Sequence, residues 1–327
     1  MTTGSSPGRP GARLAGAVCL AWCLATSGVG PVSGQGGSGS RLLTPWGDPD
    51  LQGTWPSGSL IAVPFERQEA LGERTTFTDE EAAERAAVLQ AGAGAGGIGP
   101  PPHWLELGDE PSQTSLVVDP EDGRVPPLTA DGARRAAAWR TQSAPGYAYA
   151  GPADLRPYDR CITRGVPGSA FPNIYSAGMQ ILQAPGLVVI RHEMIHETRV
   201  IPLGGVPHLP DGVRSYMGDP RGRWEGDTLV VETTNFNGLT GSYGRNGDGN
   251  PTSEALRLVE RFRRTAPDTL RYEVRVEDPL TFTAPWVVAF DLPRDADYTL
   301  YEYACHEGNH AMTHMLSAAR AAERPEP

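Results

Sequence analysis

The sequence predicts a mainly β protein: an antiparallel up-and-down, lipocalin-like barrel with an irregular, partly helical N-terminal wrap and a C-terminal helix. Two observations carry this prediction. The 327 residues include 40 glycines and 31 prolines, which favour loops and strands over helix bundles. From residue 179 onward, short segments rich in β-branched and aromatic residues alternate with turn residues, as is typical of strands that pair in chain order.

The chain is expected to divide into a signal peptide over 1–36, the wrap over 37–178 and the barrel domain with its helix over 179–327. Two segments of the wrap carry helix signals, 78–90 and 131–141. The first begins with threonine followed three residues later by glutamate, the pattern of a capping box.

The predicted strands of the barrel share β-branched or aromatic residues and end at turn-forming residues. They cover 179–184, 187–203, 228–235, 255–263, 269–277, 281–291 and 298–303. A final helix is expected over 310–322.

The N-terminus has the features of an export signal. Arg9 and Arg13 precede an apolar stretch over 14–26, which is too short to span a bilayer. We therefore expect a periplasmic or secreted protein with no stable membrane insertion after cleavage. Cys161 and Cys305 are expected to form a disulfide there, closing a loop of about 144 residues and contributing on the order of 5 kcal/mol; two buried free thiols are the alternative.

Charge excludes several partners and chemistries. The formal net charge is -11, and all 28 basic residues are arginine. An acidic surface repels phosphate backbones, so nucleic acid is not an expected partner. The absence of lysine from the sequence excludes Schiff-base chemistry. No phosphate loop or dinucleotide fingerprint occurs, so no nucleotide or other cofactor is predicted. No Gly-x-Ser-x-Gly motif occurs either, so the sequence gives no support to a serine hydrolase.

The most concentrated group of titratable residues lies in 187–203, where His192-Glu-Met-Ile-His196 matches the zinc-protease motif H-E-x-x-H. That motif requires a helix, whereas the flanks are β-branched and favour a strand. On a strand the two histidines would lie roughly 13 Å apart, too far to bind one metal ion. We therefore expect one strand with alternating faces: His192, Met194, His196 and Thr198 on one, and Glu193, Ile195, Glu197 and Arg199 on the other.

Four residues are predicted to act as acid and base catalysts: Glu193, His196, His306 and Glu307. The last two lie in 301–310, at a strand-to-helix junction directly after Cys305, where sites are commonly assembled. Three ligands of a metal site are an alternative role for this group. An internal salt-bridge network, in which Glu193 or Glu197 pairs with an arginine, is the structural alternative.

Seven further residues are predicted to bind ligand because alternation turns several of them into the barrel: Arg199, Trp224, Glu232, Asn235, Glu260, Tyr272 and Asn309. Each has a structural alternative. Trp224 could cap the barrel, the strand residues could be solvated, and Asn309 could cap the final helix.

The predicted function is a non-redox enzyme acting on a small molecule, a hydrolase, lyase or isomerase. A binding protein for an apolar or sugar-like ligand is the first alternative, and a metal-dependent hydrolase is the second. Convergence of the histidines and glutamates on a cavity would favour an enzyme, whereas an apolar cavity would favour binding alone.

Several strings occur along the chain in one order: DLQGTW over 50–55, paired segments at 114–120 and 123–129, Glu193 with His196, GRWEGDTLVV over 222–231, and CHEGN over 305–309. In these strings the chain resembles a family of secreted bacterial proteins of uncharacterised function. The resemblance covers most of the mature chain but implies no particular activity. The strand pattern is similar, in architecture only, to lipocalin-type barrels.

Overall fold

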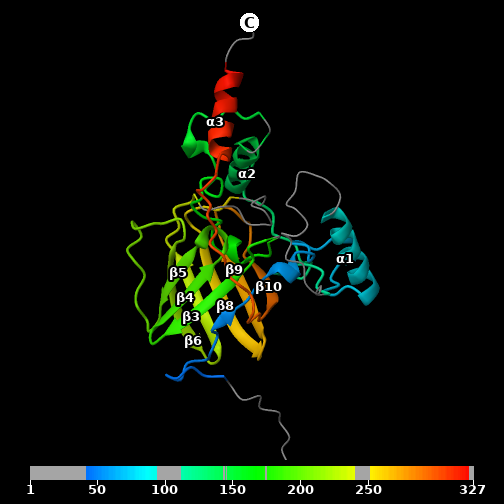
Figure 1. Cartoon of the computed structure of the whole chain (residues 1–327), viewed down its shortest axis with the longest axis vertical. Coiled ribbons are helices and arrows are strands. Elements are labelled where there is room, and N and C mark those ends of the chain that lie inside the picture. The colour runs from blue at the N-terminus through cyan, green and yellow to red at the C-terminus, as the bar shows by residue number, and fades with distance from the viewer. Residues whose placement is uncertain are drawn as a thin grey trace, which may run out of the picture. The chain divides into compact units, whose positions relative to one another are not determined.

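Two antiparallel β-sheets form the body of the chain (Figure 1). The computed structural model describes residues 42–93, 112–142, 144, 146–173, 175–239 and 251–323. The predicted signal peptide over 1–36 lies outside the described residues. In the part of the chain that is described, no helix is long and apolar enough to cross a membrane.

The smaller sheet has the strand order β1-β3-β4-β5, with bounds Gly53–Thr54, Met179–Ala184, Leu187–His192 and Thr198–Pro202. Alternate residues of β4 are buried, so Val188, Ile190 and His192 face the core. The tight β3–β4 turn places Gly186 at φ +75°, a region that favours glycine. Across β4 and β5, Ile190 pairs with Arg199.

The larger sheet has the order β2-β10-β9-β8-β7-β6, with bounds Val117–Asp119, Trp286–Pro293, Thr269–Glu277, Arg257–Ala266, Thr228–Thr234 and Asp219–Glu225. The strands β6 to β10 pair in chain order, as expected of a meander. The mainly β, antiparallel prediction is confirmed. The described strands form two sheets and no closed barrel is found among them, so lipocalin-like closure stays a prediction.

One apolar core joins the two sheets. Ile190 and Ile201 from the smaller sheet belong to the same buried cluster as Leu229 and Phe262 from the larger one. Burial of each such side chain contributes about 1.5–3 kcal/mol. Glycine allows the close approach of β6 to β5, because a Cβ at Gly222 would lie 2.9 Å from Ile201 Cγ2.

The described residues form three α-helices, α1 (Asp79–Ala93), α2 (Ala130–Gln142) and α3 (Ala311–Ala322), which confirms helices in the N-terminal half and the C-terminal helix. The predicted capping box precedes α1. The backbone N–H of Thr78 donates to Glu81 Oε2 at 2.8 Å, and the backbone N–H of Glu81 donates to Thr78 Oγ1 at 3.3 Å.

The prediction of one strand over 187–203 is wrong. The chain reverses between β4 and β5 through the short 3-10 segment η6 (Met194–His196), where Ile195 and His196 have φ of +56° and +46°. The backbone N–H of His196 closes the turn on the Glu193 carbonyl at 2.9 Å. The H-E-x-x-H motif therefore starts at the last residue of β4, His192, and runs through the hairpin turn, so its two histidines share neither an α-helix nor one strand.

This reversal also corrects the predicted faces. His192, at the end of β4, and Arg199, near the start of β5, are both buried instead of facing opposite sides. The β-branched residues at each end of the segment do form strands. After a hairpin turn, the residues that face the core can no longer be found by alternation from the first strand, because the second strand has its own register.

The prediction of a strand over 298–303 is also wrong, because this stretch is irregular and has no partner strand among the described residues. The Tyr303 carbonyl accepts a hydrogen bond from the nearby backbone N–H of Cys305 at 2.8 Å and lies 3.1 Å from His196 Nδ1, so it has no partner on a neighbouring strand in the described part of the chain. The strand predicted over 281–291 begins only at Trp286, and β6 was not predicted.

Candidate functional site

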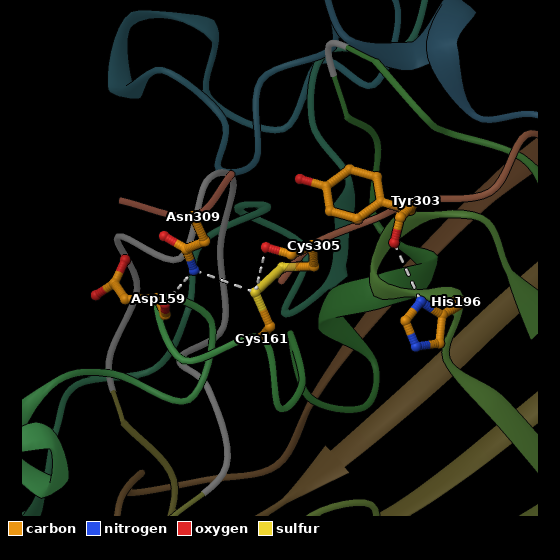
Figure 2. Close-up of a disulfide and its surroundings, with 6 residues drawn as sticks. All are labelled: Asp159, Cys161, His196, Tyr303, Cys305 and Asn309. Carbon is orange, nitrogen blue, oxygen red and sulfur yellow. Dashed lines mark hydrogen bonds between the residues drawn. A yellow bond between two sulfur atoms is a disulfide. The ribbon is translucent and has the colours of Figure 1, made fainter. Parts of the chain in front are cut away.

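The β4–β5 turn and the C-terminal segment around Cys305 meet in space (Figure 2). His196 Nδ1 lies 3.1 Å from the carbonyl oxygen of Tyr303. Two residues on, Cys305 forms the predicted disulfide with Cys161, with an S–S distance of 2.08 Å. The disulfide brings a third segment, 156–170, to the same place.

The four predicted catalytic residues differ in burial and in their hydrogen-bond partners. His196, His306 and Glu307 are exposed, and no hydrogen bond links His196 to the other two among the described residues. Glu193 is buried and accepts a hydrogen bond from the Tyr298 hydroxyl at 2.8 Å. A shared acid–base role for these four residues stays a prediction.

Glu197, the last residue of the turn, is the centre of a buried polar cluster. Its Oε1 accepts hydrogen bonds from the Thr163 hydroxyl and, at 3.1 Å, from the backbone N–H of Arg164. Its Oε2 accepts one from the Ser169 hydroxyl. The hairpin thus supplies the carboxylate, and the segment after Cys161 supplies all three donors.

Burial raises the pKa of Glu197 to about 7, and the hydrogen bonds from Thr163 and Arg164 oppose that rise. A carboxylate with such a pKa can both accept and return a proton at neutral pH. Ser169 is only partly buried, in contrast to Thr163 and Glu197. Ser169 is therefore the least buried of the side chains that bond to Glu197.

Arg164 places a buried positive charge near Glu197. Its Nη1 donates to Asn173 Oδ1 and contacts Met194 Sδ at 3.0 Å, and the guanidinium carbon lies 5.5 Å from the Tyr158 ring centroid. Among the described residues, no carboxylate oxygen lies within 4.0 Å of its guanidinium nitrogens. Burial lowers the pKa of Arg164. An amide and a thioether compensate a buried cation weakly, so the charge can act on a bound group.

Three tyrosines border Arg164. Tyr158, Tyr175 and Tyr303 are hydrogen-bonded to one another through their side chains. Burial raises the pKa of Tyr175 and of Tyr303, so both stay protonated at neutral pH. Half-buried neutral phenols offer flat apolar faces together with hydrogen-bonding groups.

His192 contributes no charge to the cluster. It is buried, and burial together with Arg199 and Arg164 lowers its pKa to about 3. The imidazole is therefore neutral in the folded protein at physiological pH. Among the described residues, no group of three or more His, Cys, Asp or Glu side chains is arranged to hold a metal ion.

Three of the predicted ligand-binding residues meet in the core, where two of them form an ion pair and the third donates a hydrogen bond to it. Arg199 donates to both carboxylate oxygens of Glu260, at 2.6 and 2.9 Å, and the Tyr272 hydroxyl donates to Glu260 Oε1 at 3.0 Å. All three are buried. An internal salt bridge is thus present, but Arg199 pairs with Glu260 instead of Glu193 or Glu197.

The remaining predicted ligand-binding residues make separate structural contacts. Trp224 packs against the core, and Glu232 pairs with an arginine of β8 at 2.7 Å. Asn235 Nδ2 donates to three carbonyls of the loop over 209–213. Asn309 does not cap α3, because its side chain donates to the Asp159 carbonyl at 3.3 Å and contacts the disulfide (Figure 2).

Sequence reasoning missed Ser169, Arg164 and Thr163. They lie in a stretch that carries neither helical nor strand periodicity, and Gly168-Ser169 matches no catalytic pattern. The only useful signal was the nearby Cys161, since its disulfide ties this stretch to the C-terminal segment.

No protein-family model, no curated protein and no solved structure matches the chain. The resemblance to a family of secreted bacterial proteins therefore stays an expectation.

Proposed function

We propose that the protein is a non-redox hydrolase that cleaves a small ester or amide, with Ser169 as nucleophile and Glu197 as general base. The single observation that carries this proposal is the hydrogen bond from the hydroxyl of Ser169, a partly buried residue, to the buried Glu197 carboxylate. A nucleophile within reach of a base, itself oriented by further groups, is the general arrangement of covalent catalysis. Thr163 and the backbone of Arg164 orient the base.

In this reaction Glu197 takes the hydroxyl proton while Ser169 Oγ bonds to the carbonyl carbon of the substrate. The bond to the leaving group then breaks, and the leaving group takes the proton from Glu197. A water molecule attacks the acyl group with Glu197 again as base. Release of the acid restores the Ser169 hydroxyl.

Arg164 has the charge to stabilise the anionic oxygen that forms during both attacks. Its guanidinium is buried and has no carboxylate within ion-pair distance among the described residues. Charge held in a water-poor site acts more strongly than the same charge in water.

The test is covalent labelling with a fluorophosphonate, followed by mass spectrometry of the digested protein. We expect an adduct on Ser169 in the parent protein, none in Ser169→Ala, and labelling slowed by about a hundredfold or more in Glu197→Gln. Ser215→Ala is the matched control, because Ser215 is exposed and its hydroxyl bonds only a turn carbonyl. Absence of an adduct on Ser169, or equal rates in Glu197→Gln, would contradict the assignment.

A sugar-binding function is the second candidate, favoured by the cluster of Tyr158, Tyr175 and Tyr303. Half-buried rings with hydroxyls suit the alternating apolar and polar faces of a sugar. Saccharide binding without turnover, together with inert Ser169, would support this candidate over the hydrolase.

Two other proposals are retained for the region around the β4–β5 turn. One is acid–base catalysis by His196, His306, Glu193 and Glu307, and the other is a metal-dependent hydrolase. Elemental analysis of the purified protein tests whether a metal is bound.

Export to the periplasm or the medium is also proposed, and the disulfide is consistent with an oxidising compartment. Lipocalin-like closure is proposed from the close approach of Gly222 to Ile201.

A further inference from the structure

A cavity of about 280 Å³ lies apart from the Glu197 cluster. Its wall is formed by α2, by the segment 153–160 and by residues on either side of 240–250. The side chains that matter here are Arg135, Trp139, Arg156, Arg160, Tyr216 and Thr252. Neither Ser169 nor Glu197 lines it. Its volume is at the lower end for small-molecule sites.

The wall is positively charged in an acidic protein. Arg135, Arg156 and Arg160 line the cavity with one carboxylate, Asp154, whereas the whole chain has a formal net charge of -11. A concave wall of one sign concentrates counter-ions of the other sign. The cavity therefore favours an anion.

One of these charges is fixed in place and another has no partner. Arg135 Nη2 donates to the Leu280 carbonyl at 2.8 Å and to Thr281 Oγ1 at 2.7 Å. In the described part of the chain, the Arg160 side chain forms no hydrogen bond or ion pair. A guanidinium without a partner can bind a carboxylate with two parallel hydrogen bonds.

The wall also offers flat surfaces. The guanidinium carbon of Arg156 lies 4.9 Å from the centroid of the Trp139 ring, so a cation and an indole are stacked in the wall. Tyr216 adds a second aromatic side chain, and Leu155 and Leu239 add apolar surface. The fully buried hydroxyl of Thr252 has no hydrogen-bond partner among the described residues. These features suit a planar ligand with an apolar body.

We propose that this cavity is a binding site for a small aromatic carboxylate. The ring of the ligand lies against Trp139 and the apolar wall, and its carboxylate pairs with Arg160. The inference is independent of the proposed hydrolase, because no residue of the Ser169–Glu197 pair takes part.

Isothermal titration calorimetry on the full chain tests the proposal, with benzoate as the probe. Benzamide has the same ring without the charge, and inorganic phosphate has charge without the ring. We expect saturable binding of benzoate, at least tenfold tighter than either comparison compound. No saturable binding of benzoate, or equal affinity for benzamide or phosphate, would overturn the proposal.

Two variants locate the site. Arg160→Gln is expected to weaken benzoate binding about ten- to a hundredfold, since it removes a charge-assisted hydrogen-bond pair. Arg124→Gln is the matched control, because Arg124 is half-exposed and lies outside the cavity wall. Thermal melting verifies that both variants are folded. Unchanged affinity in Arg160→Gln, or equal loss in both variants, would place benzoate elsewhere and refute the assignment.

Discussion

The buried pair of Arg199 and Glu260 gives the sharpest test of how the two sheets are held together. The side chains are 2% and 0% exposed, so water cannot replace a lost partner. For unit charges roughly 4 Å apart at an effective dielectric constant of about 20, the attraction is about 4 kcal/mol. Glu260→Gln should therefore lower the free energy of unfolding by about 3–5 kcal/mol, because it leaves a buried cation unpaired.

The double variant Arg199→Met/Glu260→Leu should behave differently. It removes both charges and fills the space with apolar atoms, but it also removes the acceptor of the Tyr272 hydroxyl, so it should lower the free energy of unfolding by about 1–3 kcal/mol, less than Glu260→Gln. Urea denaturation followed by circular dichroism measures all three proteins. Glu225→Gln, in exposed pairs with Arg223 and Arg261, is the control and should lower the midpoint far less than Glu260→Gln does. If Glu260→Gln and the double variant lose equal stability, packing and not charge burial explains the site.

Three further predictions concern the site and its supports. Burial raises the pKa of Glu197 to about 7, so the stability that its protonated form contributes is complete below the unfolded pKa near 4.5 and is lost as pH rises to about 7. Urea titrations should show the free energy of unfolding falling by on the order of 3 kcal/mol between these two pH values. In Glu197→Gln this dependence on pH should disappear. Gly178→Ala should destabilise the protein by about 1–3 kcal/mol, because the new Cβ would lie 2.5 Å from a tyrosine ring carbon, whereas Gly151→Ala meets no atom within 4 Å and should be nearly neutral in the same melts. Replacing Cys161 and Cys305 by serine should cost about 2–5 kcal/mol in denaturant titrations, and a variant as stable as the parent would show that the cross-link is dispensable.

The sequence predicted those parts of the fold that depend on interactions between residues close together in the chain. The capping box of Thr78 and Glu81 is visible in the sequence, and it forms as expected. The meander from β7 to β10 follows from β-branched runs separated by turn residues. Both depend on interactions between residues that are close in the chain.

The hairpin at His196 shows where that reasoning fails. Nothing in the turn marks a reversal, since it contains neither glycine nor proline, and two non-glycine residues adopt positive φ. Such a turn is held by tertiary contacts, among them the hydrogen bonds from Thr163 and Ser169 to Glu197. Those contacts join residues about thirty positions apart, so periodicity cannot reveal them.

The candidate site was predicted only in part, for the same reason. The sequence pointed to the turn and to the segment 301–310, and these do meet through His196 and Tyr303, although in the described part of the chain His306 and Glu307 make no hydrogen bond to His196. Ser169 was not predicted, because its significance arises from the carboxylate that the fold places opposite its hydroxyl.

The position of the disulfide in the chain has a consequence for resistance to proteolysis. Cys161 precedes β3 and Cys305 follows β10, so every strand from β3 to β10 belongs to one covalent ring. Cleavage of a single peptide bond anywhere in this ring leaves both fragments joined. A nicked protein would therefore migrate as one species on a non-reducing gel and separate into two only after reduction, and its strands could stay paired without an intact backbone.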